Sequence, residues 1–304
     1  TDLGFYDLRL PEARKAQADL AKEHGIYGFC YYHYWFNGKR LLNKPIDGML
    51  EQKELHMPFM LCWANENWTR RWDGLDKEIL IAQNYSQRDD ENHIRWLCEN
   101  VFVDNRYIKV DNCPVFLIYN HCSFPNIRKT IETWRRIARK EFGFKDLYIC
   151  VIESFNRPVN PVDFNFDAVV EFSPHLIHKY SISETIWEKI RLSKKIDYRD
   201  YVLAVQESIH RPSKKFKLFR SVTPSWDNTA RRGENAIIVK GSSPDKYEYW
   251  LRELLKKFKP FSKEENFIFI NAMNEWAEGN HLEPCIKYGR AYLEATKKAL
   301  EEVK

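Results

Sequence analysis

Two glutamates near the C-terminal end of the chain have the spacing and surroundings of a catalytic pair. Glu275 and Glu278 lie in the polar stretch NEWAEGNHLEP, directly after an apolar run that begins at residue 267. Cleavage of a glycosidic bond characteristically uses two carboxyl groups. One protonates the leaving oxygen, and the other supports the charge that develops at the anomeric carbon. The pair therefore indicates chemistry at glycosidic bonds, with Glu275 and Glu278 as the catalytic residues.

This interpretation carries a geometric condition. Side chains three positions apart in a strand face opposite sides, so both carboxylates reach one pocket only if the backbone turns between them. Gly279 follows directly and makes such a turn easy. If strand geometry persists, only one of the two can face the pocket, and the simpler alternative is a pair of exposed loop acids.

Polar and aromatic side chains also gather at the ends of the other apolar runs, whereas the starts of these runs carry no comparable set. Carboxylates and amides pair with sugar hydroxyls, and indoles stack on the apolar faces of sugar rings. The candidate substrate-binding residues are Tyr32, His33, Trp35, Trp63, Asn65, Glu66, Trp68, Arg71, Trp72, Asn120, Glu153, Glu171, Trp226, Asn274, Trp276 and His281. Such an asymmetry is typical of barrels whose active site lies at the carboxyl ends of the strands.

Several of these candidates have a simpler interpretation. The tryptophans that end apolar runs could be core residues, whereas those among charged or loop residues are better placed for stacking: the first group is Trp35, Trp63 and Trp276, and the second Trp68, Trp72 and Trp226. Glu66 could pair with Arg70 or Arg71. Glu153 and Glu171 could cap the helices that follow them.

The histidines favour hydrogen bonding over metal binding. His33 and His281 stand alone in the sequence, and the HxxH pair His175 and His178 is a weak metal signal. We therefore expect no metal and no cofactor.

The apolar runs are about strand length and lack polar alternation, which is typical of parallel strands covered on both faces. They span 25–35, 58–64, 114–120, 147–153, 167–172, 218–226 and 267–276, and helical patterns at 11–25, 89–102, 125–143, 244–258 and 288–303 alternate with them. This alternation predicts an α/β fold. We expect a (β/α)₈ TIM-type barrel over residues 1–304 as a single domain, with its first strand upstream of residue 1 and an insertion around 173–217. A doubly wound open sheet is the alternative, weakened because no GxGxxG follows a strand.

Composition excludes several classes of protein. The 48 basic and 43 acidic residues give a net charge of +5, a small excess that does not suggest a nucleic-acid partner. No run approaches the ~18 apolar residues of a transmembrane helix. Seven scattered cysteines without a CxxC pair indicate a reducing cytoplasm and no zinc site. Because residue 1 is Thr, a lost signal sequence stays open. The oligomeric state is not indicated, and the expected partner is an oligo- or polysaccharide.

The segments NEWAEGNHLEP and CWANENWTRRWDG resemble those of WbsX-type proteins. This bacterial family is linked to glycosyl transfer in lipopolysaccharide and capsule synthesis and is also described as glycoside hydrolase family 99-like. The resemblance runs through almost all of the chain. Residues 2–36 fit the early part of the family, where another strand precedes them, in agreement with the expected upstream strand.

The resemblance to family 99 endo-α-mannosidases is narrower. Their Asn-Glu-Trp-His-Glu-Gly signature, in a (β/α)₈ barrel, matches residues 274–279 except that Ala277 replaces the His, which leaves the substrate open. The resemblance implies retention of configuration through a 1,2-anhydro sugar, by hydrolysis or transglycosylation and without a metal. Glu275 would deprotonate the 2-hydroxyl, and Glu278 would act as acid and base.

Two other functions remain open from the sequence. One is a glycosyltransferase that uses an activated sugar donor in lipopolysaccharide, O-antigen or capsule synthesis. The lack of an Asp-x-Asp motif counts modestly against a metal-dependent transferase, although Arg70 and Arg71 could hold a phosphate. The other is a non-catalytic glycan-binding barrel, which would not need both glutamates.

Overall fold

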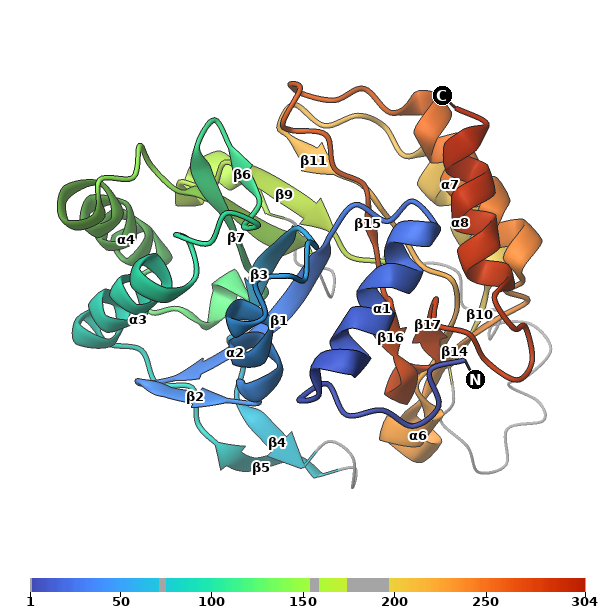
Figure 1. Cartoon of the computed structure of the whole chain (residues 1–304), viewed down its shortest axis with the longest axis horizontal. Coiled ribbons are helices and arrows are strands. Elements are labelled where there is room, and N and C mark those ends of the chain that lie inside the picture. Colours follow the sequence, from blue (N-terminus) through green and yellow to red (C-terminus); the bar gives the residue numbers. More distant parts are fainter. Residues whose placement is uncertain (1, 71–74, 154–158, 174–196, 304) are drawn as a thin grey trace.

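A parallel sheet forms the centre of the protein (Figure 1). The computed structural model describes residues 2–70, 75–153, 159–173 and 197–303. Six strands pair in parallel in the order β1 (Phe29–Phe36), β3 (Phe59–Trp63), β7 (Cys113–Ile118), β8 (Tyr148–Glu153), β9 (Ala168–Glu171) and β11 (Leu218–Phe219). The chain then continues through β12 (Ser221–Val222), which pairs in parallel with β15 (Phe269–Ile270). The strands therefore follow one another in space in their chain order.

Burial explains why these segments read as continuous apolar runs. Every residue of β3, β7, β8 and β9 is buried, so neither face of these strands requires polar side chains. The strands β1 and β15 are only partly buried. In the described part of the chain, no strand pairs with both of them, and the sheet is not closed there. The strand expected upstream of residue 1 stays a prediction.

The five predicted helices are present. They are α1 (Pro11–Glu23), α3 (Gln87–Asn100), α4 (Ile127–Phe142), α7 (Pro244–Lys257) and α8 (Ala291–Glu301). Local chemistry sets their ends: the Ser86 side chain caps α3, the Asn126 side chain caps α4, and Gly143 ends α4 with φ of 72°. The helices α3 and α4 pack together on one side of the sheet, and α7 and α8 pack together on the other side of the molecule (Figure 1).

The sequence analysis did not predict the further elements, most of which span few residues. They are β2 (Lys39–Leu41), α2 (Lys44–Glu51), β4 (Trp68–Arg70), β5 (Leu75–Ile81), β6 (Lys109–Val110), η2 (His121–Ser123), η3 (Pro161–Phe164), β10 (Asp197–Asp200), α5 (Tyr201–His210), β13 (Trp226–Asp227), α6 (Thr229–Arg232), η7 (Gly233–Asn235) and β14 (Ile237–Lys240). The strands β10, β14 and β13 form a separate three-stranded sheet. Of the insertion expected at 173–217, residues 174–196 lie outside the described part of the chain.

Across the residues that the structure describes, no helix is both long enough and apolar enough to cross a membrane.

Candidate active site

A tight turn follows the last strand of the sheet. The strand β16 (Asn274–Glu275) pairs with β17 (Asn280–His281), and the 3₁₀ turn η8 (Trp276–Glu278) connects them through Gly279. Gly279 has φ of 56°, and a Cβ placed on it would lie 3.1 Å from the backbone oxygen of Asp227. The turn therefore requires glycine at this position for both its conformation and its packing. The turn changes the direction of the backbone between Glu275 and Glu278, which is the condition for both carboxylates to reach one pocket.

Both glutamates line the same pocket, which has a volume of about 380 Å³. Its walls come from residues at or beyond the carboxyl ends of β1, β3, β7 and β9, from the hairpin β4–β5, from the sheet β10–β14–β13, and from α6 and the 275–278 turn. The lining residues are Tyr32, Tyr34, Ala64, Glu66, Asn67, Trp68, Thr69, Tyr119, Phe172, Arg199, Trp226, Asn228, Arg231, Arg232, Ile237, Val239, Glu275 and Glu278. Six residues chosen from the sequence are among them: Tyr32, Glu66, Trp68, Trp226, Glu275 and Glu278.

The two carboxyl groups differ in their electrostatic surroundings. Burial raises the pKa of Glu278 to about 7, with a smaller contribution from Glu275 and an opposing one from Arg231. Arg231 Nη1 donates a hydrogen bond to Glu278 Oε1 at 2.7 Å. Burial also raises the pKa of Glu275, against the influence of Arg231 and of the Ala277 backbone N–H. Near neutral pH, Glu278 can therefore hold or release a proton, as an acid/base catalyst must.

Aromatic rings form a large part of the pocket wall. The Trp68 ring meets the Tyr34 ring edge-on at 5.3 Å between centroids, and Tyr32 meets Tyr119 in the same way at 6.1 Å. Trp226 also lines the pocket, although only 4% of it is exposed. Rings held in place by other rings offer flat apolar surfaces to the C–H faces of a sugar.

A chain of amide groups holds the third acid of the pocket. Asn120 Nδ2 donates to Glu66 Oε1 at 2.7 Å, and Asn65 Nδ2 donates to the Asn120 carbonyl, also at 2.7 Å. In return, Asn65 Oδ1 accepts the Asn120 backbone N–H at 2.8 Å. Asn65 and Asn120, expected to bind substrate, thus lie behind Glu66 and orient it. Arg70, one of the alternative partners considered for Glu66, forms an ion pair with Glu78.

Three further candidates belong to the turn and its two short strands but do not line the pocket. Trp276 stacks on His281 with 3.7 Å between ring centroids, and its Nε1 donates to Glu283 Oε2 at 2.7 Å. Asn274 Nδ2 donates to the Tyr6 hydroxyl at 3.1 Å. These contacts tie the turn to Glu283 and Tyr6, and Trp276 itself is 42% exposed.

His33, Trp35 and Trp63 lie in the core, where the alternative interpretation placed the two tryptophans, and not in this pocket. They are at most 4% exposed. His33 Nε2 lies 2.9 Å from His93 Nε2, Trp35 Nε1 donates to Asp89, and Trp63 Nε1 donates to the Trp35 carbonyl. Their polar atoms are satisfied inside the protein, and burial lowers the pKa of His33 to about 3. They occupy alternate positions on β1 and β3 that face away from the pocket.

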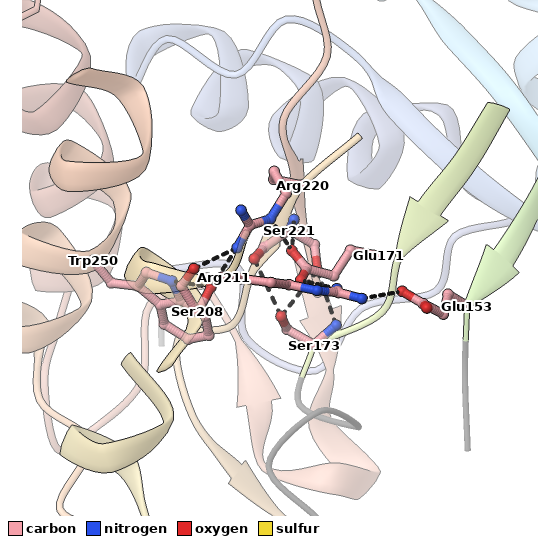
Figure 2. A network of polar contacts seen from close by, with 8 residues as sticks. All are labelled: Glu153, Glu171, Ser173, Ser208, Arg211, Arg220, Ser221 and Trp250. Carbon is pink, nitrogen blue, oxygen red and sulfur yellow. Dashed lines mark hydrogen bonds and ion pairs between the residues drawn. The ribbon is translucent and has the colours of Figure 1, made fainter. Parts of the chain in front are cut away.

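Glu153 and Glu171 form ion pairs with arginines. Arg211 bridges the two carboxylates, and Arg220 Nε donates to Glu171 Oε2 at 2.8 Å (Figure 2). The Ser221 backbone N–H also donates to Glu171 at 3.0 Å. Neither acid lines the pocket. Their network fastens the loop after α5 to the ends of β8 and β9, so the expectation that they bind sugar is not met by their position.

Arg71, Trp72, His175 and His178 lie outside the described residues. Within the described part of the chain, no cluster of three or more His, Cys, Asp or Glu side chains is placed to hold a metal ion.

Six charged or aromatic lining residues were missing from the sequence-based set: Tyr34, Tyr119, Phe172, Arg199, Arg231 and Arg232. Tyr34, Tyr119 and Phe172 lie within the last residues of apolar runs, and Arg231 and Arg232 follow the run 218–226, so a wider window at each strand end would have included them. Arg199 belongs to β10, a strand that the sequence analysis did not predict.

Comparison with known proteins finds similarity along almost the whole chain. The family model "Glycosyltransferase WbsX" matches residues 1–296. "Uncharacterized protein WxcX" of Xanthomonas campestris pv. campestris is 37% identical over 307 residues, which cover 98% of this chain but only 43% of that relative. The chain thus spans less than half the length of the curated relative it matches.

Solved structures show the same fold. A "Glycoside hydrolase-like protein" superposes with a TM-score of 0.64 at 14% identity, over 98% of this chain and 88% of the other. The GH99 endo-alpha-mannosidase from Bacteroides thetaiotaomicron superposes with a TM-score of 0.60 at 12% identity, over 99% of this chain and 82% of the other. These likenesses confirm the expected family 99-like (β/α)₈-type architecture, although the described strands do not close a barrel. With the family match, they support carbohydrate-active chemistry. The chain belongs to the WbsX glycosyltransferase family.

Proposed function

We propose that this chain is a retaining enzyme that acts on α-mannoside-like glycosidic bonds, by hydrolysis or transglycosylation. The observation that carries the proposal is that Glu275 and Glu278 line the same pocket, whose wall is partly aromatic. The turn that ends at Gly279 lets both side chains reach this pocket. The different surroundings of the two acids support different roles for them. Glu275 serves as the base, and Glu278, whose pKa burial raises to about 7, serves as the acid.

The first step forms a three-membered ring in the sugar. The Glu275 carboxylate removes the proton from the 2-hydroxyl, and the resulting oxygen attacks the anomeric carbon. The bond from that carbon to the leaving oxygen breaks, and the leaving oxygen takes the proton of Glu278. The products are a 1,2-anhydro sugar, protonated Glu275 and ionised Glu278.

The second step reverses these roles. The Glu278 carboxylate removes a proton from water or from an acceptor hydroxyl, whose oxygen attacks the anomeric carbon. The bond between that carbon and the ring-closing oxygen breaks, and Glu275 returns its proton to the 2-oxygen. Each step inverts the anomeric carbon, so the overall configuration is retained.

The neighbouring side chains fit this chemistry. The Tyr34 and Trp68 rings can stack on sugar rings on either side of the bond, and Glu66, held by Asn120, can accept hydroxyl hydrogen bonds. Arg231 contacts Glu278 directly, so it favours the ionised acid that forms at the end of the first step.

The test is incubation with a panel of α-mannosides and bacterial polysaccharides, with product stereochemistry followed by NMR. We expect retained configuration and no turnover of a 2-O-methyl mannoside, which cannot form the anhydro sugar. Glu275→Gln should abolish turnover of every substrate. Glu278→Gln should lose several orders of magnitude on ordinary mannosides but keep its first step on a glycosyl fluoride, whose leaving group needs no proton. Glu234→Gln, an exposed acid outside the pocket lining, is the matched control. Inverted product would refute the anhydro-sugar route.

A second function is favoured by the family description and by the arginines of the pocket. A glycosyltransferase of lipopolysaccharide, O-antigen or capsule synthesis would use Arg231 or Arg232 to hold the phosphate of an activated sugar donor. A panel of nucleotide sugars in a thermal-shift assay separates the two functions, because only a transferase should be stabilised by a donor. Wild-type protein that binds glycans without any turnover would instead indicate a non-catalytic barrel.

A further inference from the structure

Three arginines line the candidate active site, and all come from one part of the fold. Arg199 lies on β10, and Arg231 and Arg232 end α6, which connects β13 to β14 of the same small sheet. The aromatic residues Tyr32, Tyr34 and Tyr119 come instead from the ends of the central strands. The pocket therefore combines a cationic segment with an aromatic segment.

The three guanidinium groups differ in the hydrogen-bond and ion-pair partners that they have within the protein. Arg231 is paired with Glu278 at 2.7 Å. The Arg232 guanidinium has no hydrogen-bond or ion-pair partner in the part of the chain that the structure describes. Arg199 is only 4% exposed and has an interaction of its own, but a guanidinium carries five N–H donors and can serve a second acceptor.

The acids of the pocket do not cancel this charge near neutral pH. The carboxyl groups of the lining are Glu66, Glu275 and Glu278, as many as the guanidinium groups. Burial raises the pKa of Glu278 to about 7, so its protonated form is accessible near neutral pH. With Glu278 protonated, as its proposed role as the acid requires, three guanidinium groups face two carboxylates in the lining.

We propose that the pocket binds a glycan with an anionic substituent, a carboxylate or a phosphate, close to the bond acted on, and that Arg232 is its main contact with Arg199 in support. The choice of reaction rests on the proposed function, but the anionic subsite does not need it. A planar guanidinium matches a carboxylate or phosphate through two parallel hydrogen bonds. A neutral sugar packed over Arg232 would remove water from the cation without supplying a counter-charge, which is unfavourable.

Binding of three small probes to the wild-type protein tests this subsite. The probes are methyl α-mannopyranoside, methyl α-mannopyranosiduronate and methyl α-mannopyranoside 6-phosphate, measured by calorimetry at pH 7.5 in low salt. We expect one or both charged probes to bind at least about tenfold more tightly than the neutral probe. We also expect this preference to weaken in high salt, because part of it is a charge interaction. The identity of the better charged probe distinguishes carboxylate from phosphate.

The variants assign the effect to Arg232. Arg232→Gln should bring the charged probes to the affinity of the neutral one, and Arg232→Lys should keep part of the preference because it retains the charge without the planar fork. Arg139→Gln removes the same charge from α4, outside the pocket lining, and should change nothing. Equal affinities for all probes, no binding of either charged probe, or a preference that survives Arg232→Gln would overturn the inference. Charged probes that bind as expected to a protein without mannosidase turnover would reject the proposed function and leave the subsite standing.

Discussion

Arg231 Nη1 and Glu278 Oε1 lie 2.7 Å apart, and this contact opposes the burial of the same carboxyl group. The guanidinium favours the ionised form of Glu278, whereas burial favours the protonated form. Burial is the larger influence, because the pKa of Glu278 is raised to about 7 despite the arginine. The acid/base candidate is thus tuned by two opposing groups, and its protonation should respond to a change in either one.

The pH dependence of activity follows from the two carboxyl groups. Glu275 must be ionised and Glu278 protonated at the start of the proposed reaction. Because both pKa values are raised and that of Glu278 is about 7, we expect a bell-shaped profile of kcat/KM. Activity should fall as the pH rises through about 7, where Glu278 loses its proton, and fall again in acid, where Glu275 gains one. A profile that stays flat from pH 6 to pH 9 would exclude Glu278 as the acid.

Replacement of Arg231 should move the alkaline side of this profile. In Arg231→Met, burial acts on Glu278 without the opposing cation, so the pKa of Glu278 should rise further and activity should persist to higher pH. The measurement is kcat/KM against pH for both proteins on one substrate. The substitution also removes a stabilising contact for ionised Glu278, so we expect the first step, which ionises Glu278, to slow about tenfold or more. An alkaline limb that stays in place or moves to lower pH would contradict the assigned balance.

Much of the fold was predictable because its signals are local. The strands β3, β7 and β8 are buried on both faces, which produces unbroken apolar runs, and α4 begins at a capping Asn126 and ends at Gly143. The shared pocket of Glu275 and Glu278 was predictable because both follow an apolar run and Gly279 permits a turn beside them. The elements β10, β14 and α6 were missed because each spans only four residues, and β10 pairs with β14 about 40 residues further along the chain.

The direction of a side chain was harder to predict than its place near a strand end. His33 and Tyr34 are adjacent on β1, yet His33 packs beside His93 in the core and Tyr34 lines the pocket. Side chains alternate across a strand, so the face must be known before either is assigned. Glu171 followed a strand as expected, but the arginines that occupy it, Arg211 and Arg220, lie 40 or more residues further along the chain. No local pattern could have indicated that pairing.

The turn at Gly279 offers a test of the geometry itself. Gly279→Ala must adopt a φ of 56° and place its Cβ 3.1–3.3 Å from atoms of Asp227. We expect a loss of about 1–3 kcal/mol in the free energy of unfolding. We also expect a loss of activity, because Glu278 immediately precedes the displaced residue.

Gly241→Ala is the matched control for this change. Gly241 also has a positive φ, of 86°, but its Cβ would meet only the end of the Lys246 side chain at 3.5 Å, outside the pocket lining. It should lose about 1 kcal/mol of stability and keep its activity. Equal effects of the two substitutions on kcat would show that the turn does not position Glu278.

The final prediction concerns the buried acid behind the turn. Glu283 is 2% exposed and accepts hydrogen bonds from the Tyr6 hydroxyl at 2.9 Å, from Gln17 Nε2 at 2.7 Å and from Trp276 Nε1 at 2.7 Å. Glu283→Gln replaces one accepting oxygen with an NH₂ donor that would face other donors. We expect a loss of about 1–3 kcal/mol in the free energy of unfolding, since buried donors would lose their acceptor. We also expect kcat to fall more than KM rises, because Trp276 stands between the two catalytic glutamates.

A double-mutant cycle separates this positioning role from simple destabilisation. Trp276→Phe keeps a ring that can stack on His281 but removes the N–H that Glu283 accepts. If Glu283 acts on catalysis through this hydrogen bond, the double variant should have nearly the same kcat as the more impaired single variant. If the two losses multiply instead, Glu283 affects the site by another route, and its contact with Trp276 does not set the position of the catalytic turn.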